Sequence, residues 1–424
     1  MFIICEISLK FNNFQIVTDF RDIDVLSKDN LSKDDIVIQS YARTPIGGFQ
    51  GGLSTLSATD LGGVCVSQVI GRAEIHPEDI DEVIMGCVLP AGLGQAPARQ
   101  AALNGGLPYS AGAVTVNKMC GSGLYAVMLA HDHIRAGTHA TMIAGGMESM
   151  TNAPYLLPKA RCGYRMGHER VVDHMFFDGL EDVYDDGKLM GVLAEQCAGH
   201  YEFSREEQDA FAIRSLSRAQ KAIKDGAFVK EMAGISIESR KGAININDDE
   251  QPGKGDADKI PLLKPAFHPK GTVTAANASS ISDGAAAVVL TTLEKAEQKG
   301  MRPAARIVGH AIYAQEPKWF TTAPVGALKT LSEKTGWDLK DVDLFEINEA
   351  FAVVPMAVMH DLDLPADKVN IHGGACALGH PIGASGARVL CTLLAAMEVH
   401  DVKKGMAALC LGGGEAVAIA VERF

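Results

Sequence analysis

The sequence has no excess of basic residues, no framework of paired cysteines and no long hydrophobic run. Its 424 residues include 39 Lys and Arg against 52 Asp and Glu, a formal net charge of −13. Nucleic-acid binding depends on clustered cations that release phosphate counterions, so this balance argues against a nucleic-acid partner. It leaves room for one anionic small molecule held by a local basic patch.

The nine cysteines are an odd number, and none of them forms a C-x-x-C pair. We therefore expect neither a disulfide nor a zinc scaffold, and a reducing cytoplasm is the natural setting. No stretch reaches the roughly 18 apolar residues of a spanning helix, so no membrane segment is expected. Residues 1–33 lack the basic start and small-residue cleavage site of a signal peptide. We interpret them as an N-terminal extension of unknown role.

Glycine is abundant, with 44 residues, against a usual share of about 7%. The chain is long enough for two or three domains. Strand patterns are predicted at 35–42, 82–88 and 113–116, and a helical pattern at 58–71. Strands that alternate with helices indicate an α/β fold of parallel sheet layers with crossover helices.

Two segments resemble each other, which suggests a duplicated α/β domain. Residues 120–147 run from Cys-Gly-Ser-Gly through an apolar helix to a strand ending in IAGGM. Residues 379–414 run from Gly-His-Pro-Ile-Gly-Ala-Ser-Gly through an apolar helix to a strand ending in LCLGGG. We expect a functional site where the two halves meet.

The middle of the chain is different in character. It contains a proline- and arginine-rich loop and then a helix whose start is marked by Ser204 and Glu207, an S-x-x-E capping box. A charged, turn-rich stretch follows, at 238–264. We predict an inserted loop domain at 151–279, between an N-terminal half at 34–150 (completed by about 280–300) and a C-terminal half at 301–424.

Cys120 follows the strand pattern AVTVN and precedes Gly121-Ser122-Gly123 and an apolar helix. This places its sulfur at the N-terminal end of a helix, where free N–H groups and the helix dipole favour a thiolate and lower the thiol pKa. Catalysis is one interpretation, and a buried structural cysteine is the other.

Three further residues lie at the ends of predicted elements. His380, in GGACALGHPIGASG, is presented by a loop and suits proton transfer. Cys410 ends an apolar strand before three glycines, and is either a core thiol or a base opposite the first cysteine. Asn348 ends the strand 344–347 and starts a predicted helix, where its amide either orients a water or a histidine or only caps the helix.

Together these motifs resemble the thiolase family. The resemblance is carried by VNKMCGSG around Cys120, NEAFA at 348–352, GGACALGHPIGASG at 373–386 and CLGGG at 410–414, with YARTPIGGFQG and VTAANASSISDGAAA. It covers the chain from about Asp35 to its end and is greatest for the acetyl-CoA acetyltransferase members. It implies a thiolase fold: two similar βαβ-rich halves stacked as α-β-α-β-α layers, with an inserted loop domain.

The resemblance also implies roles for the site residues. Cys120 would carry an acetyl group, His380 would activate it, and Cys410 would exchange a proton with the α-carbon of a second acyl-CoA. Asn348 would hold a water for one oxyanion hole, and the backbone N–H groups of Cys120 and Gly412 would form the other. The implied reaction condenses two acetyl-CoA molecules to acetoacetyl-CoA and coenzyme A, or reverses that step.

Coenzyme A is thus expected as a substrate, with no permanently bound cofactor and no metal ligand. The family's pantetheine contacts match Leu180, Met190, Phe267, Ala275, Ser279, Ala350 and Phe351. Arg240, Lys254 and Lys259 are candidates for the coenzyme's phosphates, and a solvated surface loop is an equal alternative for them. The resemblance also implies a homo-oligomer, with a dimer of dimers expected.

Two departures concern substrate preference. Leu189 stands where many short-chain biosynthetic thiolases have histidine, and Ser280 replaces a glycine of the NASG loop. A 3-ketoacyl-CoA thiolase of broader chain length, acting in fatty-acid degradation, is therefore an alternative. Two others are a cysteine hydrolase, because Cys, His and Asn also serve papain-like proteases, and a catalytically silent binding protein on the same scaffold.

Two other motifs are not assigned a function. His131-Asp132-His133 resembles a metal motif, but residues two apart on a helix point in different directions, and we interpret them as surface residues. Gly92-Leu93-Gly94 lacks the third glycine and the acidic partner of a dinucleotide fingerprint, so no nicotinamide cofactor is expected.

Overall fold

The chain contains two halves that share one arrangement of strands and helices. The computed structural model describes residues 31–240 and 242–424, and Ser32–Phe424 form one compact unit. Most of the predicted extension, residues 1–30, lies outside the described residues. The first half comprises β1 (Ile36–Arg43), α1 (Ala58–Ala73), β3 (Glu82–Gly86), α2 (Pro97–Asn104), β4 (Gly112–Val116), α3 (Ser122–Arg135), β5 (Thr141–Ser149) and β12 (Ser282–Thr292), with the short strand β2 (Gly47–Gly48) paired to β12.

The second half follows the same order of elements. It comprises β13 (Ala305–Ala314), α8 (Ala323–Thr335), β14 (Leu344–Ile347), α9 (Val353–Leu362), α10 (Ala375–Leu378), α11 (Ser385–Val399), β15 (Lys404–Leu411) and β16 (Glu415–Glu422), and α7 (Leu293–Gln298) connects the halves. The strands of the first half are ordered β4-β3-β5-β12-β1, and those of the second β14-β15-β16-β13. Val369 bridges to Phe345 in parallel beside β14, in the place that β4 occupies in the first half. The duplication predicted from the sequence is therefore visible in the topology.

The sheet is mixed, and the expectation of purely parallel layers is wrong. β3 pairs in parallel with β4 and β5, and β14 with β15, but β12 and β16 pair antiparallel with both their neighbours. The reason is local for β15 and β16, because the turn Gly412–Gly414 joins them directly and a tight turn can only reverse the chain. The two halves join where Val37 and Ile38 of β1 pair with β13.

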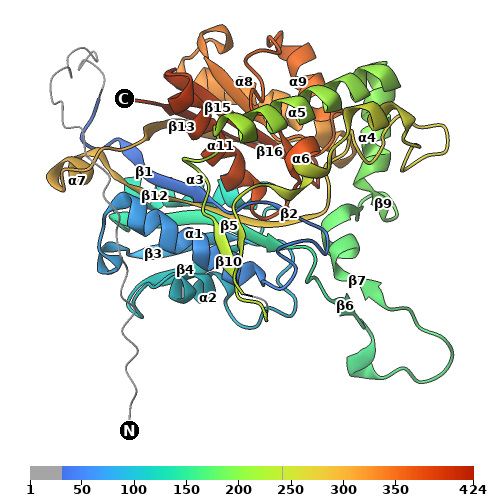
Figure 1. Cartoon of the computed structure of the whole chain (residues 1–424), viewed down its shortest axis with the longest axis horizontal. Helices are drawn as coiled ribbons and strands as arrows, with labels where there is room; N and C mark the ends of the chain where they lie inside the picture. The colour runs from blue at the N-terminus through green and yellow to red at the C-terminus, as the bar shows by residue number, and fades with distance from the viewer. Residues whose placement is uncertain (1–30, 241) are drawn as a thin grey trace. The chain divides into compact units, whose positions relative to one another are not determined.

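The elements stack in five layers, as the resemblance implied (Figure 1). Helices α3 and α11 lie between the two sets of strands, with α1 and α2 outside the first set and α8 and α9 outside the second. Strand β12 packs against a different helix layer on each of its two faces. Its Ala286, Val288 and Leu290 pack in the central apolar cluster with α3 and α11, whereas Ala285 and Val289 pack against α1, because successive side chains of a strand point to opposite faces.

The chain between β5 and β12 adds short elements around the two halves. They are β6 (Tyr155–Leu156), β7 (Val172–Asp173), the π-helical turn η4 (Phe176–Leu180), β8 (Glu181–Asp182), β9 (Lys188–Leu189), α4 (Met190–His200), α5 (Arg205–Asp225), β10 (Ile235–Ile237), β11 (Ile244–Ile246) and α6 (Glu250–Lys254). The predicted capping box is confirmed: Ser204 caps α5 and Glu207 closes the box. None of the described helices is long and apolar enough to cross a membrane.

Most local predictions agree with these bounds, and one does not. The strand patterns at 35–42, 82–88 and 113–116 correspond to β1, β3 and β4, and the helical pattern at 58–71 to α1. The helix expected directly after Asn348 begins only at Val353, with Ala352 as its N-cap residue. Asn348 therefore does not cap a helix, and its side chain is available for other contacts.

Candidate active site

Cys120 lies in a tight turn between β4 and α3, as predicted. Met119, before it, has a left-handed backbone (φ 46°), and Gly121 is the N-cap residue of α3. Ser122 holds this turn together: its hydroxyl donates to the Met119 carbonyl (2.6 Å) and accepts from the Lys118 N–H (2.8 Å). A turn of this kind presents the cysteine side chain at the end of a strand, where it is half-buried.

The N-terminal ends of α3 and α11 meet backbone to backbone. A Cβ on Gly386 would lie 2.2 Å from the backbone nitrogen of Leu124, and a Cβ on Gly123 would lie 2.8 Å from that of Ala387. Any side chain at either position would push the helices apart. These glycines therefore let the loop with Cys120 and the loop with His380, far apart in sequence, lie next to each other.

His380 is buried and its tautomer is determined by its neighbours. The ring atom Nδ1 lies 2.5 Å from the Ser385 hydroxyl, which itself donates to the Pro381 carbonyl (2.9 Å). Since the single hydroxyl proton is used there, the Ser385 oxygen accepts from Nδ1–H, and Nε2 keeps its lone pair. Burial, and to a lesser degree the charge of Arg388, lowers the pKa of His380 to about 3, so the ring is neutral at pH 7 and able to accept a proton.

Asn348 faces the free nitrogen of this ring. Its Nδ2 lies 3.4 Å from Nε2 of His380, and its Oδ1 accepts from Nη2 of Arg388 at 3.5 Å. Arg388 is buried and makes an ion pair with Glu346 (3.0 Å). The guanidinium thus fixes which way the amide points, because it can only donate to the Asn348 oxygen.

Cys410 lies near the end of β15, fully buried, and Gly412 follows in the turn to β16. Burial raises the pKa of Cys410 well above its usual range, and a negative charge on the nearby Cys120 would raise it further. The backbone N–H groups of Gly412 and of Cys120 itself point at the Cys120 sulfur and oppose the rise of its pKa. The structure therefore brings together Cys120, Cys410 and Gly412, and beside the Cys120 loop it places His380 and Asn348.

The expected lowering of the Cys120 pKa is wrong. Burial raises the pKa of this thiol to about 11, although the two backbone N–H groups act in the other direction. The desolvation of a thiolate outweighs the helix N-terminus here, because Cys120 packs against Met150, Ile382 and other apolar side chains. The resting site consequently holds a neutral thiol beside a neutral imidazole, and the thiol needs a base to react.

The predicted coenzyme contacts fall into two groups. Leu180 ends η4 and packs in the same apolar cluster as Cys120. Met190 begins α4, and its sulfur lies 3.8 Å from the place where a Cβ on Gly412 would be. Leu180 therefore lies near Cys120, and Met190 lies near the Gly412 turn.

The second group lies around the segment 273–281. Phe267 and Phe351 make an edge-to-face pair with centroids 6.0 Å apart, and both the N–H and the hydroxyl of Ser279 donate to the Ala350 carbonyl. Ala275 lines a cavity of about 270 Å³. This cavity is also lined by Ser280, Cys376, Lys254 and Lys259, whereas Arg240 is not among its lining residues.

The unassigned motifs are also located by the structure. His131 and His133 do point in different directions, as predicted: His131 meets His310, and His133 faces Glu82. The interpretation of all three as surface residues is wrong for His131, which is 8% exposed and packed against His310. Gly92 and Gly94 both have positive φ in the loop before α2.

Three residues of this region were missed in the sequence. Ser385 orients His380 and Arg388 orients Asn348, and Glu148 accepts from the N–H groups of Val88, Leu89 and Gly383. Two of the three could have been found from the sequence, because each is a charged residue within an apolar segment. Arg388 lies in the helix segment SGARVLCTLL, and Glu148 lies near the end of the strand segment TMIAGGMES. A charged residue at such a position is buried and needs partners.

Comparisons with known proteins concern the chain as a whole. Residues 36–294 match a family model described as "Thiolase, N-terminal domain", and residues 301–423 match "Thiolase, C-terminal domain". An acetyl-CoA acetyltransferase of Cupriavidus necator is 49% identical over 92% of this chain and 99% of its own length. Acetyl-CoA acetyltransferase 1 of Arabidopsis thaliana is 48% identical over 94% of this chain and 96% of its own length.

Two solved structures share the fold. A Bacillus anthracis acetyl-CoA acetyltransferase superimposes with a TM-score of 0.90 at 39% identity, covering 92% of this chain and 99% of its own. An Ascaris suum thiolase in complex with coenzyme A superimposes with a TM-score of 0.87 at 41% identity, covering 92% and 100%.

Proposed function

Because the chain belongs to the thiolase family, we propose that it is an acetyl-CoA C-acetyltransferase that joins two acetyl-CoA molecules to acetoacetyl-CoA, or splits acetoacetyl-CoA with coenzyme A. The observation that carries the proposal is that the Cys120 turn, Cys410 of β15 and the Gly412 N–H come together beside neutral His380. Two thiols and an imidazole supply the nucleophile and the bases that two half-reactions on thioesters require.

The first half-reaction acetylates Cys120. Nε2 of His380 takes the thiol proton, and the sulfur attacks the thioester carbonyl of acetyl-CoA. The developing oxyanion accepts from the N–H groups of Cys120 and Gly412, which already point at this sulfur. The carbon–sulfur bond of the thioester then breaks, and the coenzyme leaves as a thiol with the proton from His380.

The second half-reaction forms the carbon–carbon bond. Nε2 of His380 takes the thiol proton of Cys410, and the resulting thiolate removes a proton from the methyl carbon of the second acetyl-CoA. The enolate oxygen is stabilised by the protonated His380 ring and a water held by Asn348. The enolate carbon attacks the acetyl group, the bond from that group to the Cys120 sulfur breaks, and the sulfur takes the proton back from His380 as acetoacetyl-CoA is released.

The substrate side of the proposal is the coenzyme pocket. Leu180, Met190, Phe267, Ala275, Ser279, Ala350 and Phe351 would contact the pantetheine arm. Lys254 and Lys259 are favoured over Arg240 for the phosphates, since both line the cavity that contains Ala275. The Ascaris suum relative was solved with coenzyme A, which supports coenzyme A as a substrate here.

Assembly, location and pathway are also proposals. The strand β4 lies at the end of the sheet order, and its Val114 is 40% exposed. An edge strand with an exposed apolar side chain suits pairing with a second copy, which supports a homo-oligomer, and we favour a dimer of dimers. We propose a cytoplasmic enzyme of lipid metabolism, with an N-terminal half, a loop domain over the coenzyme site and a C-terminal half at the boundaries given above.

One experiment tests the reaction directly. Purified protein is incubated with acetoacetyl-CoA and coenzyme A, quenched, digested and examined by mass spectrometry. We expect an acetyl adduct on the peptide containing Cys120 and none in Cys120→Ser. An adduct on another residue, with Cys120 unmodified, would refute the assignment.

The main alternative is a thiolase of broader chain length. Leu189 and Ser280, the two departures from short-chain relatives, motivate it, and Ser280 lines the cavity with Ala275. We expect thiolysis of acetoacetyl-CoA to exceed that of a longer 3-ketoacyl-CoA in kcat/KM. The opposite order would favour the alternative. Hydrolysis that persists in Cys410→Ala, with no thiolysis at all, would favour a cysteine hydrolase instead.

A further inference from the structure

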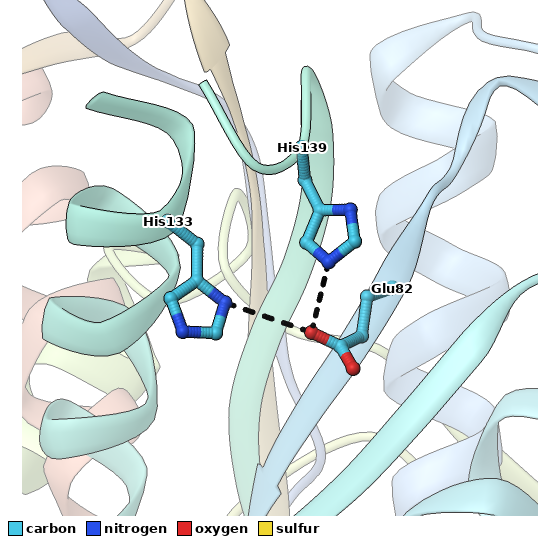
Figure 2. A group of neighbouring side chains, drawn as sticks. All are labelled: Glu82, His133 and His139. Carbon is cyan, nitrogen blue, oxygen red and sulfur yellow. Dashed lines mark ion pairs between the residues drawn. The ribbon is translucent and has the colours of Figure 1, made fainter. Parts of the chain in front are cut away.

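We propose that Glu82, His133 and His139 form a binding site for a divalent transition-metal ion of the zinc class, away from the catalytic turn. The three side chains converge from β3, from the C-terminal end of α3 and from the loop after α3 (Figure 2). Their ligand atoms, one carboxylate oxygen and two imidazole nitrogens, all lie within 4.8 Å of one another. The site would revise the expectation that the chain has no metal ligand.

The distances between the ligand atoms fit coordination of one metal ion better than they fit hydrogen bonds. Oε2 of Glu82 lies 3.3 Å from Nε2 of His139 and 3.7 Å from Nδ1 of His133. Hydrogen bonds between such atoms are about 2.7–3.2 Å long. Zinc bonds of about 2.0–2.2 Å in a tetrahedron place neighbouring ligand atoms roughly 3.4 Å apart. The two separations lie on either side of this value, and the separation of the two imidazole nitrogens is at most 4.8 Å.

One of the three ligand atoms has no other partner. Nδ1 of His133 is buried and makes no hydrogen bond within the described part of the chain. A buried polar atom without a partner is costly, and a bound cation would satisfy it. The site is nevertheless reachable, because the His133 and His139 side chains are 40% and 27% exposed. An ion and a completing water can therefore enter.

A neighbouring group of similar composition provides a contrast. Asp132 lies 2.9 Å from Nδ1 of His131 and 2.9 Å from Nε2 of His310 through the same oxygen. Those are hydrogen-bond lengths, and they satisfy all three side chains without an ion. The two groups share α3, yet among the described residues only the group with His133 contains a buried ring nitrogen without a hydrogen bond.

The fold holds the three ligands in place by backbone contacts. Helix α3 ends at Arg135. Two residues later Gly137, with a left-handed φ of 75°, reverses the chain, and the Thr138 N–H closes the turn on the His133 carbonyl (2.9 Å). Asp81, next to Glu82, accepts from the N–H groups of Ala140 and Thr141. The loop with His139 is thereby tied to the strand with Glu82, and the helix C-terminus favours a cation.

The ion would serve the fold rather than the reaction. The ligand set of two imidazoles and one carboxylate suits zinc and related borderline ions, with water as a fourth ligand. Cys120 lies at the opposite end of α3, about 20 Å away for a helix of this length. We infer that the metal clamps the end of the helix whose start carries Cys120.

The test is metal binding by the full chain after removal of metals with a chelator. Co²⁺ is the first probe, because visible d–d bands report tetrahedral coordination and a thiolate charge-transfer band would reveal binding by cysteine instead. We expect d–d bands without the thiolate band, with one ion per chain. Zn²⁺ at about tenfold above its dissociation constant should raise the melting temperature by about 2 °C or more.

Two variants and one control make the result specific. His139→Ala and Glu82→Gln should keep the metal-free melting temperature and lose the cobalt bands and the zinc-dependent shift. His310→Ala, in the neighbouring group, should keep both. Absence of binding, a thiolate band, or binding that survives His139→Ala and Glu82→Gln would overturn the proposal, as would loss of binding in His310→Ala alone. None of these outcomes depends on acetyl transfer, so the proposed function is tested separately.

Discussion

The two halves of the molecule carry different polar and reactive side chains at equivalent positions. Gly86 and Gly146 are the last pair of β3 and β5, and Ile347 and Ala408 are the last pair of β14 and β15. We align the halves on these pairs, which equates Gly86 with Ile347 and Gly146 with Ala408. By the same alignment Cys87 corresponds to Asn348, and Glu148 corresponds to Cys410. In the first half, Cys87 and Glu148 face each other (3.5 Å) and Glu148 anchors loops. In the second half, the equivalent residues line the proposed reaction site.

The helix-starting loops differ in the same way. Ser122 and Ser385 each begin a central helix, and each donates its hydroxyl proton to a carbonyl in the preceding turn. Ser122 accepts from a backbone N–H, whereas Ser385 accepts from the His380 ring. The duplicated framework thus keeps the serine contacts that hold each turn, while the first copy presents the proposed nucleophile Cys120 and the second presents the proposed base His380. The comparison leads to four predictions.

The largest effect is expected from removing the nucleophile. Cys120→Ala should lower kcat for acetoacetyl-CoA thiolysis by about 10⁴-fold or more, and the exposed Cys162→Ala should leave it unchanged. His380→Ala added to Cys120→Ala should slow the enzyme no further than about threefold, because the two residues act in one step. Steady-state kinetics measures all three, and additive losses would show that the loops act independently.

The second prediction concerns the charge state of the resting pair. The raised Cys120 pKa and the lowered His380 pKa make both groups neutral between about pH 5 and 9. Alkylation of Cys120 by iodoacetamide should therefore accelerate about tenfold per pH unit from pH 7 to 10, as the thiolate fraction grows. Peptide mapping separates Cys120 from Cys162. A rate that is constant from pH 6 to 9 would instead indicate a thiolate–imidazolium pair.

The third prediction compares the two serines. Ser385→Ala should lower kcat by about 10- to 100-fold with little change in KM, since the His380 tautomer is no longer imposed. Ser122→Ala removes the acceptor of the Lys118 N–H and should cost about 1–2 kcal/mol of folding free energy, with a loss in kcat below about fivefold. Equal kinetic losses in the two variants would mean that Ser385 only supports its turn.

The smallest effect concerns Glu148 and pH. Burial raises the pKa of Glu148 to about 7, with the N–H donors of Val88 and Leu89 opposing the rise. The folded state therefore binds its proton more tightly than the unfolded state, whose carboxyl has a pKa of about 4.3. The stability from this group is complete below that value and is lost as pH rises to about 7.

Glu148→Gln removes this titration. We expect the free energy of unfolding of the wild type to fall, relative to that of Glu148→Gln, between about pH 4.5 and 7, with activity at fixed pH changed by less than about threefold. Urea denaturation of both proteins at several pH values measures it, and the difference cancels contributions from other groups. A constant difference would show that Glu148 is ionised throughout.

The alternation of strands and helices and the two glycine-rich loops were readable from the sequence because they are local. The bounds of α1, β4 and β14 follow from periodicity and turn residues within each segment. The positions of Cys120, His380, Asn348 and Cys410 at element ends followed from the same patterns. The antiparallel direction of β12 and β16 could not be predicted from the sequence, because strand pairing depends on partners elsewhere in the chain.

The contacts of the residues that support the site and the direction of the Cys120 pKa shift could not be predicted from the sequence. Ser385, Arg388 and Glu148 act through contacts with atoms 5 to 235 residues away. The Cys120 pKa was predicted with the wrong sign, since the helix N-terminus is local but the apolar wall around the sulfur comes from Met150 and Ile382. The proposed metal site of Glu82, His133 and His139 likewise joins segments that no sequence motif connects.

The sequence by itself determined the family, the duplicated units and which side chains stand at the ends of strands and helices, since backbone periodicity and turn chemistry are properties of short segments. Only the tertiary structure decided which of those ends meet, how His380 and Asn348 are oriented, and that the thiols rest in protonated form. These properties depend on desolvation and hydrogen bonding, which exist only after distant segments have packed together.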